Sequence, residues 1–292
     1  MPASPRARAL ALVLTAILLW STAGVLIKAT SLSPWLIACS RSLIAAALVF
    51  ALTRRDGLAM TRTSHLAALL YAVLLTCFVL ASARTTAAHA ILLQYTAPLH
   101  VLVFGALLLG ERLRLREVAT ILACMAGLSL LLRDPSPAGT LPDLALGNVF
   151  ALISGLCLGL YFVLLKHPKA QTPNPAATVV IGNLWVVVLT LPFVLAEPAP
   201  TPTAVDVAVI LALGGLQIGL AYWLFALGMR RGVRSAEAAL IGFIEPVLNP
   251  VWVYLVHGES PSAMALLGGV VILGALGLQA VLAARSVRTA SA

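Results

Sequence analysis

The sequence has very little charge. Of its 292 residues only 10% are Asp, Glu, Lys or Arg, while 61% are hydrophobic and the mean hydropathy is +1.03. A soluble domain usually carries about 25% charged residues, so this composition excludes that class. Apolar stretches of about 20 residues, the length that crosses a bilayer core as a helix, recur along the whole chain. We therefore predict an all-α polytopic membrane protein.

The sequence also lacks motifs for metal, ATP or covalent catalysis. Its four cysteines stand singly in apolar segments with no CxxC pair, which indicates small core residues and neither a disulfide framework nor a metal site: Cys39, Cys77, Cys124 and Cys157. There is no P-loop, so ATP does not drive this protein directly. HExxH, GxSxG and paired aspartates are missing from the apolar segments. We expect no cofactor and no enzymatic activity, with an intramembrane enzyme as the weaker alternative.

Proline, glycine and charge clusters divide the apolar sequence into ten candidate transmembrane helices. They cover residues 8–28, 34–53, 65–83, 86–108, 116–132, 144–165, 175–196, 205–229, 235–256 and 262–284. The first has the basic start of a signal peptide, but its apolar stretch runs through Ile27, which favours an uncleaved helix.

Basic residues between the predicted helices fall almost entirely on one side. With the N-terminus in the cytoplasm, fifteen of the 19 Lys and Arg residues are inside, while only Lys28, Arg84 and Arg133 are outside and Arg41 lies within a helix. Positively charged loops mark the cytoplasmic side of membrane proteins. The bias predicts that both termini are cytoplasmic, and it accounts for the net charge of +9 without a nucleic-acid partner.

The two halves of the chain are related by a repeat. At an offset of 148 residues, QYTAPLHVLVFGALLLGE (94–111) aligns with GFIEPVLNPVWVYLVHGE (242–259) without a gap. We predict two five-helix repeats, 8–132 and 144–284. Because five is odd, the second repeat enters the membrane from the opposite side. The arginines agree, since GERLRLRE is basic and its counterpart GESPSAM is not. Inverted repeats are typical of secondary transporters, whose site lies near the midplane between the repeats.

These motifs resemble a known family. The P…lgE pattern that closes 86–108 and 235–256, the Glu245-Pro246 pair and the W-S-x6-K run from Trp20 to Lys28 are similar to the EamA-type drug/metabolite transporter superfamily. Within it the sequence looks most like the YddG-type exporters of aromatic amino acids. The resemblance covers essentially the whole chain. It implies ten helices, a bacterial inner-membrane location and export of small metabolites.

The segment GFIEPVLNPVW (242–252) carries polar groups at the expected depth of the bilayer centre. Glu245 and Asn249 are one helical turn apart and share a face. Pro246 and Pro250 each leave a backbone carbonyl without its helical donor, which is tolerated against protein or a water-filled cavity. We interpret this face as the substrate path, with Pro246 and Pro250 as flexible points. The alternative is a permanently protonated Glu245 that locks two helices together.

The equivalent segment of the first half has different polar residues. Its candidate path residues are His89, Gln94 and Tyr95, and Pro98 is the third flexible point. His89 titrates near neutral pH in its ordinary state, although a neutral, packed histidine explains it equally well. For His100 we favour the packed interpretation.

Three further features bear on the path. Five aromatic residues lie deeper than the interfacial aromatic belts: Trp20, Tyr161, Trp185, Tyr222 and Trp223. Trp20 and Trp185 are the favoured candidate walls for an aromatic substrate, with plain core packing as the alternative. Arg41 is a candidate for a structural ion pair, or, less favoured, for binding a substrate carboxylate. Glycine-rich 268–277 suits close packing inside the chain, or else a homodimer seam.

Together these features predict a secondary transporter. We expect an inner-membrane exporter of small amphiphilic metabolites, foremost aromatic and other neutral amino acids and in addition organic cations, that works by alternating access. Its partners are a small-molecule substrate and membrane lipid. The alternative is a structural subunit of a membrane complex, which needs neither repeat symmetry nor polar groups at the midplane.

Overall fold

The structure is a computed structural model that describes residues 4–84, 87–131, 144–198, 201–257 and 263–290. Within these ranges all regular secondary structure is helical. The first half contains α1 (Pro5–Trp20), α2 (Ala23–Lys28), α3 (Pro34–Thr53), α4 (Arg62–Arg84), α5 (Ala87–Gln94), α6 (Ala97–Leu109) and α7 (Leu115–Leu131). The second half contains α8 (Leu144–Lys166), α9 (Ala177–Ala196), α10 (Ala204–Ala212), the π-helical η4 (Leu213–Leu220), α11 (Ala221–Arg230), α12 (Ser235–Gly242), α13 (Ile244–His257) and α14 (Ala263–Ala290).

The helices occupy the predicted ranges, but several are broken. Six stretches are long and apolar enough to cross a membrane, and Ala97–Leu109 and Leu266–Gln279 are shorter apolar helices. The predicted range 8–28 breaks at Ser21 and Thr22, 86–108 breaks at Tyr95 and Thr96, and 235–256 breaks at Phe243. The range 205–229 is continuous but passes through η4. At membrane depth the backbone groups freed by a break must contact protein or a water-filled cavity. The three breaks are therefore candidate positions for a functional site.

Capping residues explain where the intact helices begin. Ser33 accepts a hydrogen bond from the Leu36 amide, and Pro34 occupies the first turn of α3. Thr203 and Asp206 form a capping box at the start of α10. Asp206 also accepts a 2.6 Å hydrogen bond from Thr30, which ties the end of the first broken helix to α10.

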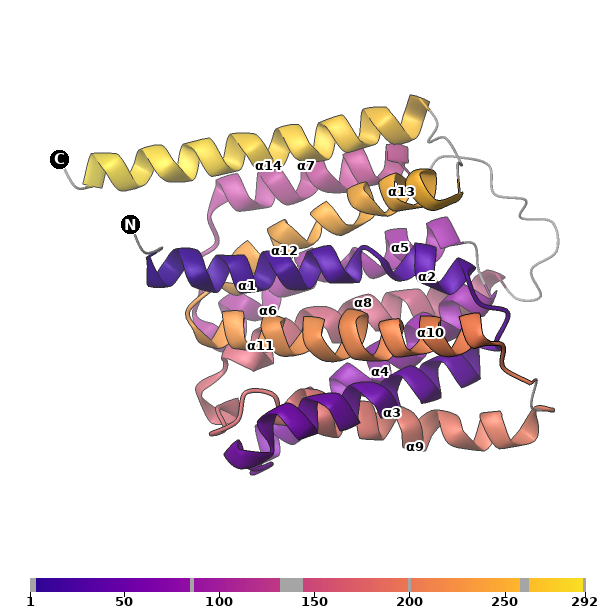
Figure 1. The fold of residues 1–292 in the computed structure, drawn as a ribbon. Coiled ribbons are helices and arrows are strands. Elements are labelled where there is room, and N and C mark those ends of the chain that lie inside the picture. Colours follow the sequence, from indigo (N-terminus) through magenta and orange to yellow (C-terminus); the bar gives the residue numbers. More distant parts are fainter. Residues whose placement is uncertain (1–3, 85–86, 132–143, 199–200, 258–262, 291–292) are drawn as a thin grey trace.

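The helices of the two halves interleave, as Figure 1 shows. The extensive interfaces α4 with α8, α3 with α9, α1 with α11, and α7 with α14 each join one half to the other. In the repeat alignment, α4 is equivalent to the α10–α11 stretch and α8 is equivalent to the α1–α2 stretch. The α4–α8 interface is therefore the counterpart of the α1–α11 interface. The packing is therefore consistent with a two-fold relation between the halves.

Glycines allow the closest approaches between helices. A Cβ atom on Gly155 of α8 would lie 2.7 Å from the carbonyl oxygen of Gln94, and one on Gly159 would lie 2.6 Å from Cβ of His100. In α7, a Cβ on Gly127 would lie 2.9 Å from the carbonyl oxygen of Gly268. The glycine-rich start of α14 is thus used for packing within the chain, whereas Gly274 and Gly277 have open space beside them.

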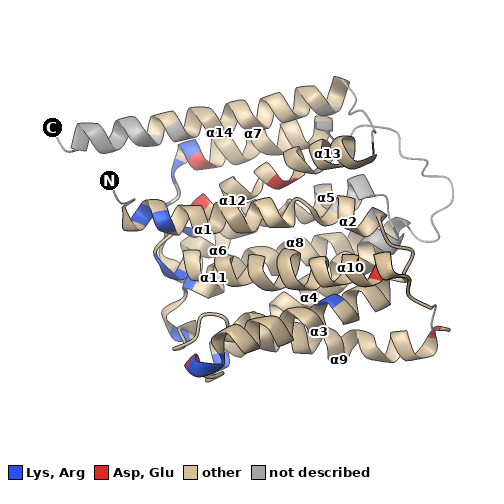
Figure 2. Ribbon diagram, in the orientation of Figure 1, with Lys and Arg blue, Asp and Glu red and all other residues tan. Residues whose placement is uncertain are grey.

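Charged residues gather at one end of the bundle. The two chain ends lie at the same end, and most of the basic residues drawn in Figure 2 lie there too. We call it the basic end. The basic loops, which the sequence predicted to lie on the same side of the membrane, are thus at the same end of the bundle.

Candidate functional site

Two of the helix breaks meet inside the bundle. Tyr95 at the first break and Phe243 at the second are 148 residues apart, the offset of the repeat, and their ring centroids lie 5.5 Å apart. Pro98 and Pro246 follow three residues after each break, and both are buried. Proline cannot donate to the carbonyl four residues before it, so each break leaves a backbone oxygen exposed to its surroundings. Equivalent positions of the two halves therefore face each other here. We call this contact the junction.

Tyr95 uses its hydroxyl to join the two breaks. The hydroxyl lies 3.0 Å from the carbonyl oxygen of Gly242, which is the carbonyl that Pro246 cannot bond. It also lies 3.0 Å from Oε2 of Glu245. Tyr95 thus replaces the missing backbone donor and holds the carboxyl group at the start of α13.

The junction accommodates Glu245 in both protonation states. As a carboxylate, Glu245 accepts from the phenol, whose single proton is shared with the Gly242 carbonyl. As a neutral acid, Glu245 donates to the phenol oxygen, and the phenol proton then serves Gly242 alone. A group that keeps its partners in both states is suited to gaining and losing charge during a transport cycle.

The third break is tied to the same helix as Glu245. Ser21, at the end of α1, accepts a 2.8 Å hydrogen bond from the indole nitrogen of Trp252 in α13. Ser21 also donates to the carbonyl of Leu18, so it caps the interrupted helix while it binds α13. Trp252 follows Glu245 by seven residues, or two helical turns, so the face of α13 that carries Glu245 also meets the break in the first helix.

Gln94 fixes the first break from the other side. Its amide donates to Oγ of Ser154 at 2.8 Å, and Ser154 in turn donates to the carbonyl of Leu74 at 2.9 Å. Gly155, next in α8, lies against the carbonyl of Gln94. Gln94 therefore anchors α5 to α8 and α4.

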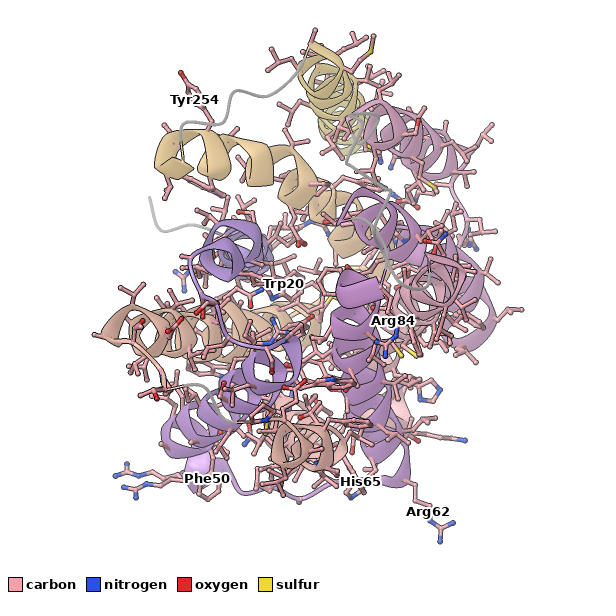
Figure 3. All side chains as sticks on the ribbon, turned by 90° about the vertical axis from the view of Figure 1, so that its right-hand side faces the viewer. Trp20, Phe50, Arg62, His65, Arg84 and Tyr254 are labelled. Atoms are coloured by element: carbon pink, nitrogen blue, oxygen red, sulfur yellow. The ribbon has the colours of Figure 1, made fainter. Side chains whose placement is uncertain are left out.

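Next to the junction lies a buried cluster of aromatic rings, which we call the aromatic cluster. It consists of Trp20, Tyr71, Tyr161, Phe162, Tyr222 and Phe225. Trp20 is only 6% exposed and packs at 4.5 Å from Tyr222 and 5.0 Å from Phe225. Figure 3, a view along the bundle, shows Trp20 at its centre, whereas Phe50 and Tyr254 point outward. The sequence singled out Trp20, Tyr161 and Tyr222. It missed Tyr71, Phe162 and Phe225, whose only local signal was an aromatic residue in an apolar run.

The structure does not bring all predicted path residues together. Trp185 is 42% exposed on α9, and no ring contact of the described residues joins it to the aromatic cluster. The side chains of His89, Asn249 and Pro250 lie outside the described part of the structure. His100 lies against Gly159 of α8, which agrees with packing.

The surroundings of Arg41 differ from those that the sequence predicted. The sequence favoured a structural ion pair, but Arg41 is 3% exposed and, among the described residues, no hydrogen bond or ion pair reaches it. Its position in α3 keeps it under η4, where a Cβ on Gly214 would lie 2.6 Å from the Arg41 carbonyl oxygen. The predicted partner acid is therefore not found in the described part of the chain.

Ion pairs join the two halves at the basic end. Glu111 accepts from Lys166 at 3.1 Å and from the Ser235 hydroxyl at 3.3 Å. Arg234 binds Glu117, whose residue is 2% exposed, at 2.5 Å. Burial by itself would lower the pKa of Arg234, but the hydrogen bond that it donates to Glu117 and the charges of the neighbouring acids raise this pKa above its ordinary value. Arg234 stays charged, and the pair holds α7 against the start of α12. The sequence did not predict the pairing of Lys166 with Glu111.

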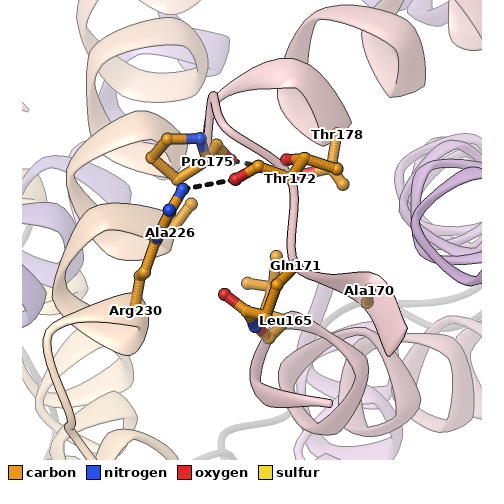
Figure 4. Close-up of a pocket in the computed structure, with 8 residues that line it drawn as sticks. All are labelled: Leu165, Ala170, Gln171, Thr172, Pro175, Thr178, Ala226 and Arg230. Carbon is orange, nitrogen blue, oxygen red and sulfur yellow. Dashed lines mark hydrogen bonds between the residues drawn. The ribbon is translucent and has the colours of Figure 1, made fainter. Parts of the chain in front are cut away.

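A small pocket lies on the surface of the same part of the bundle, as Figure 4 shows. Its lining comes from the α8–α9 connection and from α11. Arg230 crosses it and donates to the Thr172 carbonyl oxygen at 2.5 Å. The pocket is thus bridged by a structural contact. Among the residues that the structure describes, no cluster of His, Cys, Asp and Glu could hold a metal ion.

Known proteins share both the sequence pattern and the fold. The profile of the EamA-like transporter family matches residues 7–133 and again residues 145–280. The chain belongs to the EamA-like transporter family. The two matches show that the chain contains two EamA repeats. This EamA-family chain is a transporter and not an enzyme, and it is a multi-pass protein of the inner membrane.

Two of three relatives of this EamA-family chain have names that describe export. The aromatic amino acid exporter YddG of Ancylobacter novellus is 28% identical over 205 residues, which cover 68% of each chain. An uncharacterized transporter of Archaeoglobus fulgidus is 29% identical over 202 residues, or 67% of this chain and 68% of that one. The pseudopaline exporter CntI of Pseudomonas aeruginosa is 25% identical over 241 residues, or 80% of this chain and 81% of its own. One crystal structure, 25% identical, matches with a TM-score of 0.80 over 95% of this chain and 98% of that chain.

Proposed function

We propose that this EamA-family chain exports small amphiphilic metabolites, foremost aromatic and other neutral amino acids and in addition organic cations, by alternating access. The observation that supports this most is the junction, where Tyr95 of one half holds Glu245 of the other at paired helix breaks. Secondary transporters bind their substrates where interrupted helices of two inverted repeats meet. Two relatives whose names describe export support the direction.

The membrane topology that we propose has ten spans in the repeats 8–132 and 144–284, with both termini cytoplasmic. The basic end is then the cytoplasmic end. This orientation agrees with the arrangement of Lys and Arg in Figure 2. The five-helix repeat makes the two halves enter the membrane from opposite sides, and the exchange of α4–α8 with α1–α11 supports that relation.

The substrate path that we propose runs past the junction and along the aromatic cluster. Glu245, Tyr95, Gln94 and Trp20 line it, and Asn249 and His89 extend it along the same helices. Aromatic rings offer stacking and cation–π contacts to an aromatic or cationic substrate. Trp185 is left out of the proposed path because of its exposure.

The ion pairs at the basic end act as the inner gate. Each joins a residue of the first half to one of the second, so all must separate when the two halves rock apart. Pro98, Pro246 and Pro250 are the points at which the helices flex, because each lacks one backbone hydrogen bond.

Counterflow in proteoliposomes tests the proposed function. Vesicles loaded with unlabelled phenylalanine should accumulate the labelled compound well above protein-free vesicles. The same vesicles, tested with and without a pH gradient, show whether protons drive the flux. Absence of flux for phenylalanine, tryptophan, leucine and tetraphenylphosphonium would favour the alternative of a non-transporting subunit.

A further inference from the structure

Within the part of the chain that the structure describes, several buried polar atoms have no hydrogen-bond partner. Among them are Nε1 of Trp20, Nε of Arg41, the Tyr161 hydroxyl, Oδ1 of Asn183 and Oε1 of Gln217. Buried polar groups are almost always paired, because an unpaired one loses its bonds to water without replacement. The residues come from α1, α3, α8, α9 and η4, and they gather around rings contributed by α1, α4, α8 and α11.

Arg41 is the charged member of this set. Arginine remains protonated in proteins, and among the described residues no acid is paired with this buried charge. Ala38 and Ala45 share the face of α3 that carries Arg41, and both pack in the same buried core as Tyr71 and Tyr222. Tyr71 already accepts a 3.0 Å hydrogen bond from the Asn183 amide, and it contacts Tyr222 edge-on at 4.7 Å.

Arg41 is also separate from the acid at the junction. Among the described residues Glu245 is hydrogen-bonded to Tyr95, and no hydrogen bond or ion pair joins it to Arg41. The rings of Tyr222 and Trp20 contact each other at 4.5 Å in a tilted arrangement. Ala38 and Ala45, which flank Arg41, and Ile244, which precedes Glu245, pack in the same buried core as these rings. Arg41 and the junction thus both border the aromatic cluster.

We propose that Arg41 binds the carboxylate of the transported molecule, whose apolar or aromatic part lies against Tyr222 and Trp20. A guanidinium group matches a carboxylate with two parallel hydrogen bonds, and a dry setting strengthens them. The inference rests on the proposed function and narrows its substrates to compounds that carry a carboxylate next to an apolar group. Organic cations without a carboxylate are then poor substrates.

The test compares three probes in the same counterflow assay. L-phenylalanine carries a carboxylate, L-phenylalaninamide has the same ring and amine without it, and 3-phenylpropionate has the carboxylate without the amine. Wild-type protein should move phenylalanine roughly ten- to hundredfold faster than the amide, the range expected from charged hydrogen bonds. Excess 3-phenylpropionate should inhibit phenylalanine flux, and excess phenethylamine should not.

Arg41→Gln should bring the ratio of phenylalanine to amide flux close to one, and Arg41→Lys should keep part of the preference. Because the ratio is taken within one preparation, a lower yield of folded protein cancels. Arg84→Gln is the matched control, since Arg84 lies 5.7 Å from the Phe150 ring at the end of α4 and outside the cluster. It should keep the wild-type ratio.

The outcomes separate this inference from the proposed function. Flux of phenylalanine and its amide at equal rates by wild-type protein, or an unchanged ratio in Arg41→Gln, would overturn the role of Arg41 and leave the transporter intact. If Arg41→Gln does not fold, the test is whether excess 3-phenylpropionate inhibits phenylalanine flux by the wild-type protein. Failure to inhibit this flux would overturn the role of Arg41. Absence of flux for every probe removes the proposed function, and this inference with it.

Discussion

At the scale of single residues, the hydroxyl of Tyr95 has two roles at the junction. It supplies a donor to a backbone carbonyl that lacks its helical partner, and it contacts a titratable carboxyl group. Tyr95 donates to the carbonyl freed by Pro246, and the same hydroxyl contacts Glu245. Packing and function therefore overlap at this position. Substitutions that remove only the hydrogen bonds, or only the charge, separate the two.

Glu245→Gln removes the charge and keeps an acceptor for Tyr95. We expect counterflow to fall by about tenfold or more, because the amide can neither attract a cation nor carry a proton. The unfolding temperature in detergent should change little. Glu197→Gln is the control, since Glu197 caps the far end of α9, and its flux should equal that of wild type. Normal flux through the Glu245 variant would reduce this residue to scaffolding.

Tyr95→Phe makes the opposite change. It keeps the ring against Phe243 and deletes both hydrogen bonds, so the Gly242 carbonyl loses its donor. We expect the free energy of unfolding to fall by about 1–2 kcal/mol, at the upper end of hydrogen bonds measured in membrane proteins. Thermal or denaturant unfolding in detergent measures it. Tyr254→Phe serves as the control, because Tyr254 is 50% exposed and points outward in Figure 3. Equal stability of the two variants would contradict the role of the Tyr95 hydroxyl.

At the scale of helices, close packing of α8 positions the first break. Gly155 leaves room for the backbone of Gln94, and a methyl group there would lie 2.7 Å from that carbonyl oxygen and 2.8 Å from Oγ1 of Thr96. Gly155→Ala should therefore cost about 1–3 kcal/mol of stability and lower the flux, because α5 and α6 must move away. Gly274→Ala adds the same methyl where nothing lies within 4 Å. It should be neutral or slightly stabilising, since alanine favours a helix.

Unfolding in detergent distinguishes the two glycine variants directly. Their mutation is identical and both lie within helices, so only the neighbours differ. If Gly155→Ala unfolds at the same temperature as Gly274→Ala, then α8 does not fix the break.

The sequence predicted the helical ranges, and two of its expected flexible points lie close to two of the three breaks, because the causes are local. Apolar runs set the ranges, and Pro98 and Pro246 mark the interruptions that the structure places at Tyr95 and Phe243. The break at Ser21 has no proline, and it depends on Trp252 from a distant helix. The hydrogen bonds of Tyr95 and the ring contacts of the aromatic cluster are likewise long-range contacts. The surroundings of Arg41 also come from distant parts of the sequence. Spacing along the chain contains no information about them.

At the scale of the whole molecule, three ion pairs of the described residues join the two halves at the basic end. The pairs differ in burial. Arg6 is 67% exposed at its side chain where it binds Glu237, whereas the Glu117 side chain bound by Arg234 is 3% exposed. Exposed ion pairs contribute little, and breaking a buried one leaves an uncompensated charge. We therefore expect the proposed inner gate to depend mainly on Glu117 and Arg234.

Glu117→Gln should shift the protein toward the state that is open at the basic end. The reporter is a cysteine at Ala239, which is 3% exposed on α12 behind the pair, in a background without the four native cysteines. In inside-out vesicles we expect a membrane-impermeant maleimide to label this cysteine about tenfold faster in Glu117→Gln than in the parent, which corresponds to a shift of about 1.4 kcal/mol. Arg6→Gln, which breaks the exposed pair, should label at nearly the parental rate. Equal labelling in all three proteins would show that the Arg234–Glu117 pair does not close this end, and faster labelling in right-side-out vesicles would reverse the orientation proposed for the whole bundle.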